Sequence, residues 1–147
     1  MKSKLLSTSE GRRTFAVIFD KEDEAKRGLT AFANDNGVQG AQFTAVGAFK
    51  SAVLGYFDRN RKDYRRISVD EQVEVLSFLG DLALTPDGKP EVHAHVVVGR
   101  SDGSTQGGHL LEGTVWPTLE VILVDVPEHL RKTPDPETGL ALINPRL

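Results

Sequence analysis

The sequence contains no cysteine, which excludes disulfide bonds and metal sites built from thiolates. It also lacks an apolar run long enough to cross a bilayer and an N-terminal apolar segment of signal-peptide length. These absences predict a cytoplasmic protein without a membrane partner. A positive net charge is missing too. The formal net charge of −3 does not favour binding of the chain alone to the negatively charged backbone of a nucleic acid.

The length and composition predict one soluble domain. The 147 residues are 39% hydrophobic and 27% charged, which is enough chain and apolar content for a core. Short apolar runs at regular spacing, with one convincing helical segment, predict an α+β fold with a mostly antiparallel sheet and two or three further short helical turns. We expect residues 14–147 to form this domain and the polar residues 1–13 to form a flexible arm.

The helical segment is defined by its apolar spacing. Ala25, Leu29 and Phe32 recur at helical intervals, so one face of this helix is expected to pack on the sheet. Asp20 is the expected N-terminal cap, and Gly37 the expected end of the helix.

Three of the four histidines lie in one predicted hairpin. The β-branched run Val92–Val98 is followed by turn residues around Asp102. Side chains alternate along a strand, so His93 and His95 share a face. If the turn centres on Asp102, His109 lies opposite His95, although a bulge or a one-residue slip would send it elsewhere.

Three converging neutral imidazoles would suit zinc, or another divalent transition metal such as nickel, copper or iron(II). A set of three protein ligands leaves a position for water, a carboxylate or a small-molecule ligand, as in open and catalytic metal sites. The same spacing is equally compatible with histidines that bind no metal.

Several motifs in order resemble the PPC (plants and prokaryotes conserved) domain. H-A-H and G-G-H-L-L-E-G carry the histidines, and the resemblance extends over most of the chain, from about Arg13 to Val126. The other matching segments are Ala45–Asp58, Glu71–Ser77, Leu79–Pro90 and Thr114–Val124.

The resemblance implies a single domain with a curved, largely antiparallel sheet and short flanking helices, assembled as a homotrimer. It also implies a histidine-bound metal, usually zinc, with His93, His95 and His109 as the ligands. Plant members of the family join the domain to AT-hook DNA-binding peptides. This chain lacks the Arg-Gly-Arg-Pro core of an AT-hook, which weakens the expectation of direct minor-groove binding.

Two carboxylates and one basic cluster are further candidates. Glu120, in an apolar strand, is a candidate for orienting an imidazole or for acid–base work on bound water, and an exposed position is the alternative. Glu74 matches an acidic residue that resembles a signature of the family. The basic residues that would contact a nucleic acid, or simply form a charged hairpin tip, are Arg59, Arg61, Lys62, Arg65 and Arg66.

These observations support two functional hypotheses. The first is a metal-holding trimer that associates with DNA or with another protein. The second is a small metalloenzyme whose metal activates water or polarises a carbonyl group. A structural zinc is a third alternative. No complete acid–base set is evident, so the catalytic residues and the reaction stay open.

Overall fold

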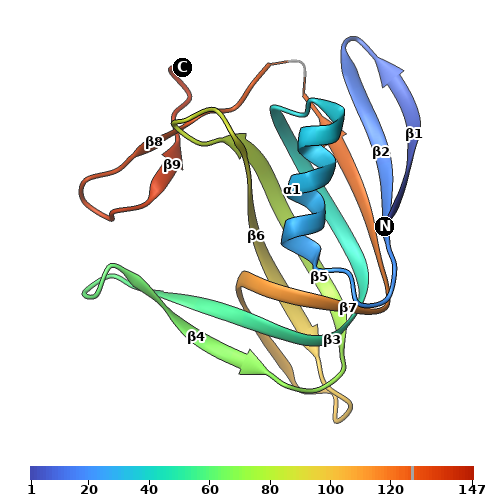
Figure 1. Ribbon diagram of the computed structural model, residues 1–147. Helices are drawn as coiled ribbons and strands as arrows, with labels where there is room; N and C mark the ends of the chain where they lie inside the picture. The colour runs from blue at the N-terminus through green and yellow to red at the C-terminus, as the bar shows by residue number, and fades with distance from the viewer. Residues whose placement is uncertain (127) are drawn as a thin grey trace.

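The computed structural model describes residues 1–126 and 128–147, most of which lie in strands. Seven strands form one antiparallel sheet in the order β1-β2-β7-β6-β5-β3-β4, and two short strands pair separately (Figure 1). The elements are β1 (Lys2–Ser9), β2 (Arg12–Phe19), α1 (Ala25–Asn36), β3 (Gly40–Asp58), β4 (Asp63–Val69), β5 (Val73–Leu84), β6 (Pro90–Gly99), β7 (Thr105–Asp125), β8 (Lys132–Pro134) and β9 (Ala141–Ile143).

The long strands β3 and β7 shape the sheet. They pair along most of their length, and the pairing is interrupted by register shifts near Gly47, Phe49 and Val53. Such irregularities bend a strand and increase its twist, and both strands bend visibly in Figure 1. β7 pairs with β2 and β6 as well. The predicted antiparallel sheet with one main helix is therefore confirmed.

Helix α1 packs through the face that the apolar spacing predicts. Ala25, Leu29 and Phe32 are buried, and the ring of Phe32 meets that of Phe15 edge-on at 5.2 Å. Gly37 ends the helix with a φ of 63°, as predicted, because glycine tolerates the left-handed conformation.

The helix begins later than predicted. The backbone groups of Glu22 and Asp23 are paired with Val115 of β7, so this segment cannot be helical. Glu24 is the N-cap instead of Asp20, and its carboxylate accepts hydrogen bonds from the N–H groups of Lys26 and Arg27.

Short flanking helices do not occur: α1 is the only helix in the described residues. The strands from β3 to β7 are joined by turns of three to five residues, which leave too little chain for a helix. Within these residues no helix has the length and apolar character needed to span a bilayer.

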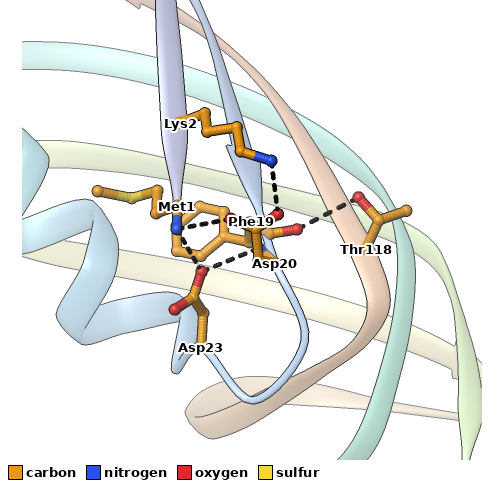
Figure 2. A network of polar contacts seen from close by, with 6 residues as sticks. All are labelled: Met1, Lys2, Phe19, Asp20, Asp23 and Thr118. Carbon is orange, nitrogen blue, oxygen red and sulfur yellow. Dashed lines mark hydrogen bonds and ion pairs between the residues drawn. The ribbon is translucent and has the colours of Figure 1, made fainter.

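The flexible arm predicted for residues 1–13 is instead β1 and the start of β2. The two strands pair in a hairpin, although every β1 side chain is exposed. Figure 2 shows how its beginning is tied to the segment before α1: the Met1 amine lies 3.0 Å from Asp20 and 2.9 Å from Asp23, and Lys2 pairs with Asp20. Hydrogen bonds to Asp23 and Asp20 raise the pKa of that amine. Backbone pairing and these ion pairs order residues 1–13, for which the polar composition alone predicted a flexible arm.

Candidate metal centre

The β6–β7 hairpin brings His93, His95 and His109 together. The turn between the strands contains Gly103 at a φ of 82°, and His95 pairs directly with His109 in an unshifted register. The register predicted from a turn centred on Asp102 is therefore confirmed.

The three imidazoles converge on a common point. One nitrogen from each ring lies within 4.8 Å of the other two. The ring centroids of His93 lie 5.3 Å from those of both His95 and His109, and the last two are 5.5 Å apart. In the described part of the chain, this is the one cluster of three or more histidine or carboxylate side chains with metal-ligand spacing.

Asp81 holds the ring of His93. It lies opposite His93 across β5 and β6, and its Oδ2 is 3.0 Å from His93 Nδ1. A carboxylate can only accept here, so in the neutral ring Nδ1 carries the proton and Nε2 keeps a free lone pair. A carboxylate behind a histidine in this way is a common support for a metal ligand, because it fixes both tautomer and orientation.

Two buried polar atoms at the cluster have no hydrogen-bond partner among the described residues: His109 Nδ1 and Asp81 Oδ1. An unpaired buried polar atom costs roughly 1–3 kcal/mol. A cation bound through His109 Nδ1 would give that nitrogen a partner. The donor set of three imidazoles also suits zinc and its neighbours in the transition series.

The surroundings keep two of the imidazoles neutral. Burial lowers the pKa of His109 to about 4, and the charges of Lys26 and the other two histidines act in the same direction. Burial also lowers the pKa of His95, aided by His93 and opposed by Asp81. A metal ligand must be neutral imidazole, so these shifts favour metal binding near neutral pH.

Tyr64 covers one side of the cluster. Its ring stacks on that of His109, with centroids 4.6 Å apart. Gly55 makes this possible, because a Cβ atom there would stand 2.7 Å from the Tyr64 ring. Burial raises the pKa of the Tyr64 hydroxyl.

A cavity of about 400 Å³ opens beside His93 and His109. Its wall includes two lysines: Lys132, whose Nζ lies 2.7 Å from Glu91, and Lys26 on α1. Burial lowers the pKa of Lys26, against the opposing charges of Glu91 and Glu24. The remaining side comes from the C-terminal hairpin, through Leu140 and residues of β9.

The other two predicted carboxylates do not join the cluster. Glu120 is exposed and lies opposite Ile18 and Val46. Glu74 is exposed and pairs with Gly99, at the far end of β6 from His93. In both cases the strand register, which the sequence left undetermined, separates the carboxylate from the histidines.

The basic residues lie on the β3–β4 hairpin and are all exposed. Arg66 forms an ion pair with Glu112, and the Arg65 guanidinium lies 5.4 Å from the centre of the Tyr56 ring. Arg59, Arg61 and Lys62 occupy the turn between the strands. The hairpin therefore presents an exposed basic tip, while Tyr64 and Gly55 of the same hairpin adjoin His109.

Comparison with known proteins identifies the family. The family model of the Plants and Prokaryotes Conserved domain (abbreviated PCC or PPC) matches residues 6–127. The chain belongs to the PPC family. Among curated proteins, residues of this PPC chain are 36% identical to the bifunctional protein GlmU of Synechococcus sp. strain JA-3-3Ab over 119 residues, which is 79% of the chain. The chain spans only 18% of that relative's length.

Solved structures of PPC-like chains superpose closely. A PPC protein from Pyrococcus horikoshii has a TM-score of 0.85 and 32% identity, covering 90% of this chain and 91% of its own. A metal-containing protein from Archaeoglobus fulgidus has a TM-score of 0.84 and 30% identity, with 98% and 99% covered. A candidate DNA-binding protein from Ralstonia eutropha JMP134 has a TM-score of 0.83 and 27% identity, with 88% and 90% covered.

Proposed function

We propose that this PPC chain binds a divalent transition metal, zinc by preference, through His93, His95 and His109, and that it acts in association with DNA. The observation that carries the metal site is the convergence of one nitrogen from each of the three rings, and a buried, unpartnered nitrogen on the His109 ring supports it. The description of the Archaeoglobus relative as metal-containing supports the same assignment.

The metal site is tested by elemental analysis of the purified protein. We expect about one transition-metal ion per chain, and we expect His95→Ala to lose it. His129→Ala is the matched control, because His129 is exposed and outside the cluster. A metal content that is unchanged in His95→Ala, or lost equally in His129→Ala, would contradict the proposal.

The DNA association is proposed to run through the basic tip of the β3–β4 hairpin. It is supported by the exposed Arg59, Arg61 and Lys62 and by the name of the Ralstonia relative. The net charge of −3 opposes autonomous binding. We therefore expect a weak, salt-sensitive interaction that depends on several hairpins acting together.

The DNA proposal is tested by retardation of duplex DNA at low and at physiological salt. Substituting Arg59, Arg61 and Lys62 with glutamine should abolish the low-salt shift. The same number of substitutions at Lys2 and Lys4 of the opposite edge strand β1 and at Arg12 of its neighbour β2 should leave a shift. If the protein gives no shift at low salt, the DNA association is wrong and the metal site is unaffected.

Assembly as a homotrimer is part of the proposal. Its support is a set of large apolar side chains that the sheet leaves exposed and that a subunit interface would bury: Val46, Leu76, Leu79, Val97 and Ile122. The mass in solution, from light scattering coupled to gel filtration, should be three times that of the 16.1 kDa chain. A monomeric mass would contradict the assembly.

A small metalloenzyme is the second candidate, favoured by the cavity of about 400 Å³ that borders His93 and His109. A metal with three protein ligands would supply an activated water or polarise a carbonyl group. This candidate predicts room for a small molecule beside the metal and an activity that disappears in the histidine variants but not in His129→Ala.

A further inference from the structure

The side chains around the cavity do not neutralise the charge of a bound metal ion. Four ionisable side chains other than histidine and tyrosine line it: Lys26, Lys132, Asp81 and Glu91. The two carboxylates offset the two ammonium groups, and the histidine ligands are neutral. The charge of a divalent ion would therefore be balanced by no side chain, and an anion from solution is the natural counter-charge.

Lys26 is the cation best placed to receive that anion. Lys132 is almost fully buried and already paired with Glu91. The ammonium of Lys26, by contrast, has neither a hydrogen bond nor an ion pair with any described residue, although it is partly desolvated. It is also the charged side chain with the largest effect on His109, so it lies close to the histidine cluster.

Another part of the cavity lining is apolar. Leu140, Leu142 and Ile143 of the C-terminal hairpin line it, and Leu142 and Ile143 are partly exposed. Apolar surface beside a cation suits a ligand with a short hydrocarbon part and one charged end. A bare inorganic anion would leave these apolar side chains in contact with water.

We propose that the cavity binds a small organic carboxylate, with one carboxylate oxygen toward the metal, the other toward Lys26, and the hydrocarbon part against Leu140 and Leu142. This inference rests on the metal site proposed above and extends it by naming the class of ligand. No side chain of the cavity is displaced, because Lys26 has no partner to give up.

The test is a titration of the Co²⁺-loaded protein with isobutyrate, followed by the visible absorption of the metal. Isobutyramide, which has the same shape without the charge, is the ligand control. Lys26→Met removes the charge and keeps the aliphatic stem, Lys26→Arg keeps the charge, and Lys4→Met, on the exposed strand β1, is the matched protein control. Cobalt content and circular dichroism verify that each variant is folded and loaded.

Isobutyrate should change the spectrum saturably in the wild type and in Lys4→Met, and isobutyramide should not. Lys26→Met should need roughly tenfold more isobutyrate, as expected when a charge-assisted hydrogen bond is lost, and Lys26→Arg should recover most of the affinity. Equal affinities for Lys26→Met and wild type, an equal response to the amide, or tighter binding of inorganic phosphate would overturn the inference. If cobalt binds but isobutyrate has no effect, this inference alone fails. If neither cobalt nor zinc binds, both the proposed metal site and this inference are wrong.

Discussion

Gly55 lies directly opposite His109 across β3 and β7, and the ring of Tyr64 covers the place where a side chain at position 55 would stand. Because Gly55 has no Cβ atom, the Tyr64 ring can lie over His109 and bury it. This relationship links the β3–β4 hairpin to the metal centre.

Gly55→Ala should displace Tyr64 and expose His109. The new Cβ atom would be 2.7 Å from the Tyr64 ring, so the ring must move. Burial is the main cause of the low pKa of His109; we therefore expect that pKa to rise toward its ordinary value, measured by NMR titration of the histidine ring protons in the metal-free protein. Tyr64→Phe, which keeps the stacked ring, should leave the pKa of His109 low. An unchanged pKa in Gly55→Ala would show that Tyr64 does not shield the imidazole.

Asp81→Asn should weaken metal binding without removing a ligand. The amide no longer fixes the proton on His93 Nδ1, and the loss of such a support costs roughly 10–100-fold in metal affinity. Affinity is measured by competition with a chromophoric chelator. Asp87→Asn, in the exposed turn between β5 and β6, is the control and should bind the metal normally. Equal affinities for the two variants would rule out the role of Asp81.

The metal-free protein should lose stability in mild acid. Burial holds the pKa of His109 at about 4, while an unfolded imidazole titrates near about 6.5. The unfolded chain therefore binds more protons between these values, so the free energy of unfolding falls as pH drops from about 6.5 toward about 4 and this contribution is constant above that range. Urea unfolding at several pH values checks this. His109→Gln should show a shallower dependence, whereas His129→Gln should match the wild type; parallel curves for all three would contradict the assignment.

Asp125→Ala should destabilise the fold strongly. The Asp125 side chain is 8% exposed and accepts a 2.6 Å hydrogen bond from Arg13 Nε, so its loss leaves a partly buried guanidinium unpaired. Removing one partner of a buried pair costs about 3–5 kcal/mol. Glu112→Ala breaks the Arg66 pair, whose side chains are 59% and 60% exposed, and should cost at most about 1 kcal/mol. Chemical denaturation of both variants measures the difference, and similar losses would contradict it.

The histidine hairpin could be predicted because its geometry is local. The turn residues around Asp102 fix the register, and the alternation of side chains then brings His95 opposite His109. The core face of α1 followed from helical spacing for the same reason. Both predictions depend on residues close together in the chain.

Asp81 was within reach of the same reasoning. β5 and β6 are joined by a turn centred on Asp87, and counting outward from it pairs Asp81 with His93. The count requires a strand that continues through Gly80, and β5 does run through Gly80 to Leu84. The glycine is present because a Cβ atom would be 2.3 Å from the Phe43 ring.

Other parts of the site could not be predicted from local patterns. Lys26 reaches the cavity through the docking of α1, and Lys132 through the C-terminal hairpin. Glu120 was a candidate because it is a carboxylate within an apolar strand, yet the register places it opposite Ile18 and Val46 and not beside the histidines. Long-range packing decides these positions, and no short sequence pattern encodes it.

At His109 the backbone of β7 is paired on both sides, with β6 through His95 and with β3 through Gly55. The scaffold under the rings is thus complete before any ion arrives, unlike a zinc finger, which folds only around its metal. A chelator should therefore remove the ion without unfolding the protein. The fraction of chains that hold a metal ion would then rise and fall reversibly with the concentration of free metal in the surroundings.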